Sequence, residues 1–336
     1  MPSIEPVDRV EVLVIVDNLT DSLSSNPPEV SSEWSRFWAS GKIRPVMGSN
    51  TCCAHHGLSL LITAHRSGQT RTLLFDAGPE GATFVRNAWM LGVDPGSIDA
   101  VMLSHGHWDH AGGLVDAISA IAGRRPSGKV PCHVHPDMFA ERGMQRSGGV
   151  VVPLGPMPNP EHLVNAGADL VYSREPQWIA DDMFHISGEI PRTTDYERGL
   201  PGQVRRNDPS SSWESDPLLI DERSVAVHVQ GKGQFVFSAC SHAGIINVLR
   251  HAKSSFPDVP LYGTMGGFHL SGNTEAIIPQ TVADLGQFGL KLLAPGHCTG
   301  WRALTAISKV FGDELVPSAV GKRYLISVNA APRPPG

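Results

Sequence analysis

Four side chains of types that bind metal ions lie within six residues of one another. They are His105, His107, Asp109 and His110, and they directly follow the apolar segment 98–103, which has the character of a strand. His105 and His107 stand two residues apart, so both imidazoles can reach one ion, while Asp109 and His110 can face a second ion or complete the first. Imidazole and carboxylate ligands suit zinc and its transition-metal neighbours. The loop is therefore predicted to be a metal site.

Strand-like segments alternate with segments of helical periodicity along the chain, as in an α/β protein. Strands are expected at 10–16, 58–63, 72–75, 98–104, 130–135, 224–229, 234–238, 261–265 and 290–294. Helices are expected at 31–40, 79–91, 114–122, 243–253, 275–288 and 302–310. Long connections near 17–57, 143–160 and 191–217 separate some of these segments, and such loops on an enzyme scaffold usually carry substrate contacts.

The order H-x-H-x-D-H after a strand is the signature of the metallo-β-lactamase superfamily, and further blocks extend the resemblance. These blocks are Asp76-Ala77-Gly78, Cys240-Ser241-His242, Gly266-Gly267-Phe268-His269-Leu270 and Pro295-Gly296-His297-Cys298. The chain resembles a branch that includes dihydropterin ribofuranosyl-aminobenzene phosphate synthase-like proteins and the hydrolytic dehalogenase of chlorothalonil. The resemblance covers roughly residues 10–328. It implies a four-layer αβ/βα sandwich, with residues 1–336 forming one domain of two pseudo-symmetric halves.

The resemblance also implies that further ligands lie at other strand ends. His297 follows the strand expected at 290–294 and matches the last histidine ligand of the pattern. The central strand end usually supplies a bridging aspartate, whereas this chain has Cys240 there and His242 two residues later. Cys240 could replace the aspartate as a thiolate ligand, or it could be a small buried residue that leaves His242 to bind. His242 is favoured, because the nearby Gly244 lets the backbone turn the imidazole inward.

A second departure from the pattern lies at the turn that usually supplies a third histidine to the first metal. Aligning the segment 184–192 on its glycine puts Glu189 at that ligand position, with His185 at the start of the turn. Either Glu189 binds, or the first site is incomplete and only one ion is held firmly. We therefore expect one or two Zn²⁺ ions, with Glu189 rather than His185 facing them.

Zinc lowers the pKa of a bound water, so that metal-bound hydroxide forms near neutral pH and acts as the nucleophile. The resemblance implies that Asp109, besides binding, orients this hydroxide or shuttles its proton. His269 is the second catalytic candidate, because it lies between glycine-rich residues after a strand. It could bind metal, donate a hydrogen bond to a developing oxyanion, or support another ligand.

Three functions fit such a site. The first is a zinc-dependent hydrolase of a small organic molecule, an ester or lactone or a chlorinated aromatic such as chlorothalonil, the last by hydrolytic dehalogenation. The second is a pterin-pathway synthase-like enzyme acting on a phosphorylated pterin precursor, for which the sequence offers only the scattered Arg192, Arg198, Arg205 and Arg206. The third is a metal-binding sensor or redox protein, against which His107 argues, because flavodiiron-type relatives have glutamate there. The hydrolase is the expected function.

Composition agrees with an enzyme that has a large core. The 336 residues are 41% hydrophobic and 18% charged, with a net charge of −6 and no basic block, so no nucleic-acid partner is expected. A small-molecule substrate is expected, and a homodimer is left open. The five cysteines include no C-x-x-C pair and are expected to be reduced thiols. An acidic N-terminus and short apolar segments predict a cytoplasmic protein without membrane contact.

Overall fold

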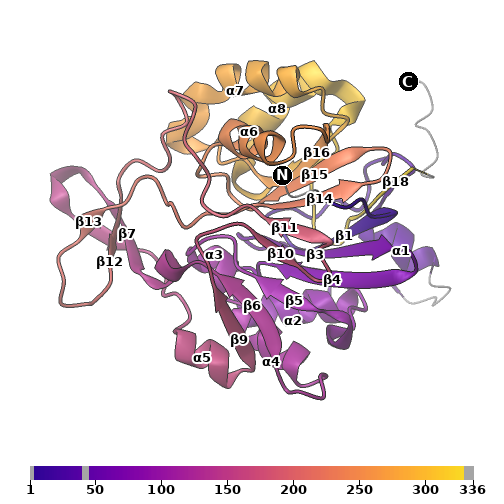
Figure 1. Cartoon of the computed structure of the whole chain (residues 1–336), viewed down its shortest axis with the longest axis horizontal. Coiled ribbons are helices and arrows are strands. Elements are labelled where there is room, and N and C mark those ends of the chain that lie inside the picture. Colours follow the sequence, from indigo (N-terminus) through magenta and orange to yellow (C-terminus); the bar gives the residue numbers. More distant parts are fainter. Residues whose placement is uncertain (1–3, 40–44, 329–336) are drawn as a thin grey trace.

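The chain folds into four layers in the computed structural model, which describes residues 4–39 and 45–328 (Figure 1). Two β-sheets lie face to face in the middle, and helices cover the outer face of each sheet. The α/β class and the αβ/βα sandwich predicted from the sequence are confirmed.

The first sheet has eight strands in the order β2-β18-β1-β3-β4-β5-β6-β9. Its strands are β1 (Arg9–Val16), β2 (Val30–Ser31), β3 (Ser59–Arg66), β4 (Gln69–Phe75), β5 (Ala100–Met102), β6 (Val130–Val134), β9 (Ala168–Tyr172) and β18 (Arg323–Ser327). Strands β4, β5, β6 and β9 are parallel to one another, so their carboxyl ends meet at one edge of the sheet. Strand β18 comes from the far end of the sequence and pairs antiparallel with β1.

The second sheet has six strands in the order β10-β11-β14-β15-β16-β17. Its strands are β10 (Gln177–Ile179), β11 (Phe184–Ile186), β14 (Val225–Val229), β15 (Gly233–Ser238), β16 (Leu261–Gly267) and β17 (Leu292–Gly296). Strands β15, β16 and β17 are parallel. Alternate residues of the facing strands, such as Val10, Val12 and Val14 of β1, fill the core between the two sheets.

The helices pack against the sheets through apolar stripes. They are α1 (Glu33–Ala39), α2 (Gly81–Met90), α3 (Trp108–Ala111), α4 (Leu114–Ala122), α5 (Pro160–Asn165), α6 (Ile245–Ser255), α7 (Ile278–Leu285) and α8 (Trp301–Phe311). Helix α4 buries Leu114, Ile118 and Ile121 against the first sheet, and α8 buries Ile307 and Phe311 against the second, at helical spacing. None of the helices within residues 4–39 and 45–328 is long and apolar enough to cross a bilayer.

Short 3-10 helices join several of these elements. They are η1 (Pro95–Ser97), η2 (Pro136–Phe139), η3 (Ser147–Gly149), η4 (Gly272–Ile277), η5 (Gly286–Phe288), η6 (His297–Thr299) and η7 (Gly312–Glu314). The single helix predicted at 275–288 is in fact η4, α7 and η5 in succession. Pro279 near the start of α7 explains the break, because proline has no N–H to continue the preceding turn.

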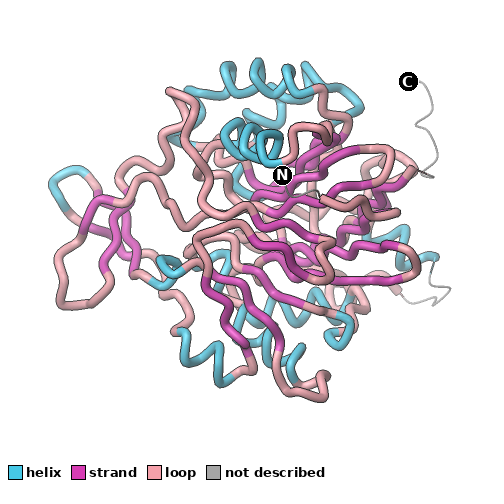
Figure 2. The backbone as a smooth tube through the Cα atoms, viewed as in Figure 1, coloured by secondary structure: helices cyan, strands magenta, loops and turns pink. Residues whose placement is uncertain are grey.

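A third, four-stranded sheet projects from the sandwich, and we call it the accessory sheet. Its strands β7 (Glu141–Gln145), β8 (Val151–Pro153), β12 (Gln203–Arg206) and β13 (Glu214–Ser215) pair in the order β13-β12-β7-β8. It is the group of strands at the left of Figure 2. The segments 143–160 and 191–217, predicted as connections without strands, thus contain strands that pair with one another.

Candidate metal centre

The candidate ligands lie together because the carboxyl ends of the parallel strands of both sheets meet at one edge of the sandwich. Four of them follow β5, two follow β15, one follows β16 and two follow β17. In chain order they are His105, His107, Asp109, His110, Cys240, His242, His269, His297 and Cys298, and all but His269 are buried. Strands from both sheets therefore build one centre.

The ligand atoms form two neighbouring triads. The first triad is His105, His107 and His242, and the second triad is Asp109, His110 and His297, with the ligand atoms of each within 4.8 Å of one another. The Cys240 thiol lies between them, within the same distance of His105 and His110, and its Sγ is 3.2 Å from His110 Nε2. Two triads with a shared thiol are the arrangement expected of a two-metal site with one bridging ligand.

Bonds on the outer side of the centre orient the histidines. Three of them use Nδ1, which lies 2.8 Å from Ser104 Oγ in His105, 2.7 Å from Asp76 Oδ2 in His110 and 3.1 Å from Asn18 Oδ1 in His297. His107 uses the other nitrogen, since its Nε2 lies 2.6 Å from Gln203 Oε1. A partner on one ring nitrogen fixes the tautomer and leaves the other nitrogen free to bind an ion. Every triad histidine except His242 has such a partner.

Several buried nitrogens at the centre have no hydrogen-bond partner. They are both ring nitrogens of His242, Nε2 of His297 and Nδ1 of His269. Burying a polar atom without a partner costs on the order of 1–3 kcal/mol, so such atoms are uncommon unless something else satisfies them. Imidazole, thiol and carboxylate donors at these spacings fit a divalent transition-metal ion, which would satisfy them.

The electrostatics keep most of the imidazoles available as ligands. Burial lowers the pKa of His107 and of His297 to about 4, and it lowers the pKa of His105 and His242 well below the ordinary value. These four rings are therefore neutral at pH 7, with a lone pair to donate.

His110 has the opposite behaviour. Burial disfavours its charge, but the carboxylates of Asp109 and Asp76 outweigh burial and raise its pKa to about 9. The pKa of Asp109 is correspondingly lowered, since the charge of His110 outweighs the effect of its own burial. The two carboxylates thus favour positive charge at His110, and a divalent ion bound to the second triad would displace its proton.

The backbone is strained around the centre. Four non-glycine residues there have positive φ, namely Asp76 (60°), Ser241 (57°), His269 (43°) and His297 (48°). Such conformations cost of order 1–3 kcal/mol each and cluster at active sites, where the surrounding structure enforces them. Here they occur at strand ends where the chain turns sharply to aim a side chain inward.

Glu189 does not belong to this centre, which corrects the expectation that it supplies a ligand. Its carboxylate accepts a hydrogen bond from Arg174 at 2.9 Å and lies 3.1 Å from His135 Nε2, with its side chain 41% exposed. His185, the other residue considered in that turn, lies on β11 against Trp178 and Phe256.

His242 takes the place that the glycine alignment gave to Glu189. It completes the first triad from a different strand end, and Cys240 faces the centre as well. Cys240 and His242 are therefore not alternatives, since both side chains point to the same centre. An alignment along the chain cannot show a ligand that reaches the same point in space from another strand.

Sequence reasoning missed two polar residues near the centre. His56 lies half-exposed at the mouth, with Nε2 3.3 Å from Asp109 Oδ2. Asn18 contacts both His56 and His297 through its side chain. Neither lies in a recognisable motif, so no signal in the chain marks them.

A cavity of about 470 Å³ opens onto the centre. The side chains of His107, Asp109, Cys240, His242, His269 and His297 form its floor. Trp108, Met144, Leu154 and Leu200 supply apolar wall, and none of the described residues that line it is lysine or arginine. Asn18, His56 and Ser271 also line it, so the cavity combines the candidate ligands with an apolar group of side chains and a few polar ones.

Comparisons with known proteins agree with this geometry. The sequence profile of the metallo-β-lactamase superfamily matches residues 55–166. The chain is also 31% identical over 270 residues to the uncharacterized protein MJ0448 of Methanocaldococcus jannaschii, covering 80% of this chain and 93% of that protein. This chain belongs to the metallo-β-lactamase superfamily.

Two further proteins resemble it. A Methanocaldococcus jannaschii protein named 7,8-dihydropterin-6-methyl-4-(β-D-ribofuranosyl)-aminobenzene-5′-phosphate synthase is 28% identical over 278 residues, which cover 80% of this chain and 89% of that protein. The crystal structure of Tm1679, described as a metal-dependent hydrolase of the β-lactamase superfamily, has a TM-score of 0.68 at 21% identity and covers 95% of this chain and 99% of Tm1679. The latter similarity concerns the fold alone.

Proposed function

We propose that this protein is a divalent-metal-dependent hydrolase of a small, uncharged organic molecule with an aromatic or apolar part. The observation that carries the proposal is the cavity itself, in which paired ligand triads lie beneath an apolar wall without lysine or arginine. Zn²⁺ is the proposed ion, because imidazoles with a thiol and a carboxylate are typical zinc ligands.

The first and second triads would hold the ion or ions. A divalent cation bound there supplies Lewis acidity and lowers the pKa of water. The Asp109 carboxylate is placed to orient a water at the floor of the cavity and to accept its proton at Oδ2. His56, 3.3 Å from that oxygen and half-exposed, is placed to carry the proton on to solvent.

His269 is placed to act on the substrate rather than on the water. It lines the cavity, its Nδ1 has no hydrogen-bond partner, and its ring centroid lies 4.4 Å from that of His242. Burial disfavours its charge, but the neighbouring Cys298, as a thiolate, outweighs burial and raises the pKa of His269. A protonated His269 would donate a hydrogen bond to negative charge that develops on the substrate.

The apolar wall sets the preferred substrate class. Trp108, Met144 and Leu200 offer contacts to an aromatic ring or an alkyl chain. Hydrolytic dehalogenation of a chlorinated aromatic such as chlorothalonil is the first candidate reaction, and hydrolysis of an ester or lactone is the second. Both need only water as the second reactant.

A phosphorylated pterin precursor is the alternative substrate, and the named synthase relative favours it. The arginines give this alternative substrate only weak support. Arg205 lies 3.8 Å from Asp137, and Arg206 is paired with Glu141. Arg198 alone of the four arginines named from the sequence lines an adjoining cavity of about 160 Å³, which shares His242 and His269 with the centre.

A substrate panel tests the proposal. The zinc-loaded protein should hydrolyse at least one chloroaromatic, ester or lactone, lose activity to a chelator, and recover it with Zn²⁺ or Co²⁺. The variant Arg198→Ala serves as the discriminating control, because it should leave turnover of uncharged substrates unchanged. Turnover confined to the phosphorylated pterin precursor and lost in Arg198→Ala would favour the alternative, and chelator-resistant activity would contradict both.

A further inference from the structure

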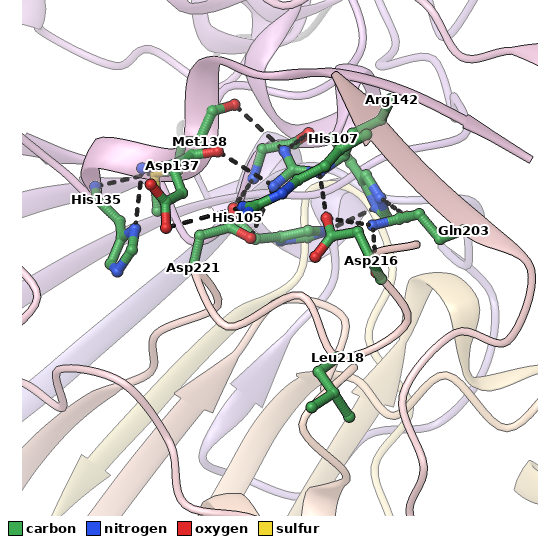
Figure 3. A network of polar contacts seen from close by, with 12 residues as sticks. His105, His107, His135, Asp137, Met138, Arg142, Gln203, Asp216, Leu218 and Asp221 are labelled. Carbon is green, nitrogen blue, oxygen red and sulfur yellow. Dashed lines mark hydrogen bonds and ion pairs between the residues drawn. The ribbon is translucent and has the colours of Figure 1, made fainter. Parts of the chain in front are cut away.

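The accessory sheet contacts the metal-binding loop through two buried polar side chains, one from each of its central strands. Gln203 begins β12 and Arg142 lies on β7, and they are 1% and 4% exposed. Figure 3 shows both side chains converging on the segment that contains His105 and His107. Burying an arginine and a glutamine is costly unless their polar atoms are well bonded, so the partners of each are informative.

Gln203 presents its amide oxygen to His107. Its Oε1 lies 2.6 Å from His107 Nε2, while its amide nitrogen lies 3.3 Å from the carbonyl oxygen of Asp216 and 3.4 Å from the Asp216 carboxylate. Two acceptors beside the nitrogen fix which end of the amide faces the histidine. An amide oxygen can only accept, so the His107 proton must be on Nε2, and Nδ1 is left with a lone pair. That Nδ1 lies on the side of the first triad, 3.1 Å from His105 Nε2.

Arg142 and Asp221 hold the peptide of Gly106, the residue between the two histidines. The Gly106 carbonyl accepts a hydrogen bond from Arg142, and the Gly106 N–H donates to Asp221 Oδ2 at 2.8 Å. Arg142 Nη2 also donates to Asp221 Oδ1 at 2.7 Å, which closes the ring of contacts. Both side chains therefore bond to the peptide of the loop that carries the ligands.

We infer that Gln203 is a positioning residue of the metal centre: its amide oxygen holds His107 in the tautomer that turns Nδ1 toward the first triad. Arg142 and Asp221 fix the backbone of the same loop, so the accessory sheet sets the geometry of the ligands. The inference concerns the metal centre on which the proposed function also rests. The same sheet provides Met144 of the cavity wall, which pairs with Gln203 across β7 and β12.

The test compares variants that keep or remove the acceptor. Gln203→Met has a similar length and no acceptor atom, so Co²⁺ should bind about ten- to a hundredfold more weakly, with an altered visible spectrum of the bound cobalt. Gln203→Glu/Asp216→Asn restores an acceptor to His107 and a donor beside it, and it should bind Co²⁺ within about threefold of the wild type, by the same reasoning.

Val204→Ala is the matched control, because it should loosen the packing of the accessory sheet without removing the contact to His107. Val204 is the next residue of β12, is buried, and points to the opposite face of the accessory sheet. It should lower the unfolding temperature of the metal-free protein while leaving cobalt affinity and spectrum unchanged. A purely structural role for Gln203 would instead make Val204→Ala and Gln203→Met weaken cobalt binding alike.

Wild-type affinity and spectrum in Gln203→Met would overturn the inference, as would failure of the double variant to restore them. A wild-type protein that binds no cobalt would overturn both this inference and the proposed function. Cobalt binding with the expected pattern of variants, but without turnover of any substrate, would overturn the proposed function alone.

Discussion

At the scale of single residues, the Cys240 thiol occupies the point where the two triads meet. Its Sγ lies within 4.8 Å of ligand atoms of both His105 and His110, and within the same distance of ligand atoms of His297 and Cys298. A thiol in that place can bridge two ions, whereas a hydroxyl is a much poorer ligand for zinc. We therefore predict that the number of ions the protein can hold depends on this side chain.

We expect Cys240→Ser to reduce the bound metal from two ions toward one, or to weaken binding at least about tenfold, because a ligand should matter no less than a residue that only orients one. Elemental analysis after dialysis against dilute Zn²⁺ measures the stoichiometry. Cys132→Ser is the control, since Cys132 is a buried free thiol on β6 and belongs to none of the candidate ligand groups. Equal metal loss in both variants would contradict a bridging role for Cys240.

Among the candidate ligands, those of one short loop have the clearest signal in the sequence, whereas His242 and His297 were predicted through the family resemblance. His105, His107, Asp109 and His110 share one short loop, so their types and spacing alone indicate a metal site. Gln203 reaches His107 only because β12 pairs with β7, and no pattern along the chain records that pairing. The wrong prediction for Glu189 has the same cause. It followed a local alignment, whereas the side chain that completes the first triad is His242, from another strand end.

At the scale of elements, the turn after β5 is packed so closely that only glycine fits between its two histidines. A Cβ on Gly106 would lie 1.9 Å from Arg142 Nη1 and 2.2 Å from the carbonyl oxygen of Met138. The second of these atoms belongs to the backbone and cannot swing aside. The tightness of this turn follows from both η2, which contains Met138, and the accessory sheet, which contains Arg142, lying against it.

Gly106→Ala should therefore destabilise the protein by about 1–3 kcal/mol or more, the usual cost of overpacking, and weaken metal binding with it. Urea unfolding of the metal-free protein and a cobalt titration measure the two effects. Gly286→Ala is the control, because nothing lies within 4 Å of a Cβ there and φ is −58°. Similar stability of the two variants would show that the turn has room to relax.

The main elements were predictable because they are apolar and periodic. The strand expected at 130–135 is β6 (Val130–Val134), and the helix expected at 114–122 is α4 with the same bounds. The accessory sheet was not predicted, since its strands are short, polar and interrupted by glycine and proline. Its stability comes from pairing between segments far apart in the sequence, which composition does not reveal.

At the scale of the whole molecule, buried neutral histidines make stability depend on pH. Burial lowers the pKa of His185 to about 4, well below the value of about 6.5 for an unfolded chain. Between these values the unfolded chain binds more protons than the folded one, so this residue makes the protein less stable as pH falls from 6.5 toward 4. Burial raises the pKa of Glu222, which acts in the opposite direction.

The contribution of His185 is isolated by comparing His185→Phe with the wild type, since the ring already contacts Trp178 and Phe256. Between pH 7.0 and 5.5, the wild type should lose about 1 kcal/mol more of its free energy of unfolding than the variant. Urea unfolding of the chelator-treated proteins at both pH values measures this difference. Parallel pH dependence in the two proteins would mean that His185 is not held neutral.

Strand β18 has a consequence for biosynthesis. On the ribosome, β1 and β3 emerge early and can pair at once, but the other side of β1 waits for β18, which is translated after every other strand of both large sheets. Until then the nascent chain shows an unpaired strand edge, which is a template for joining another chain. Aggregation is therefore a greater hazard for the unfinished polypeptide than for the finished one, and slow translation of the last segment should lengthen the period in which a chaperone is needed.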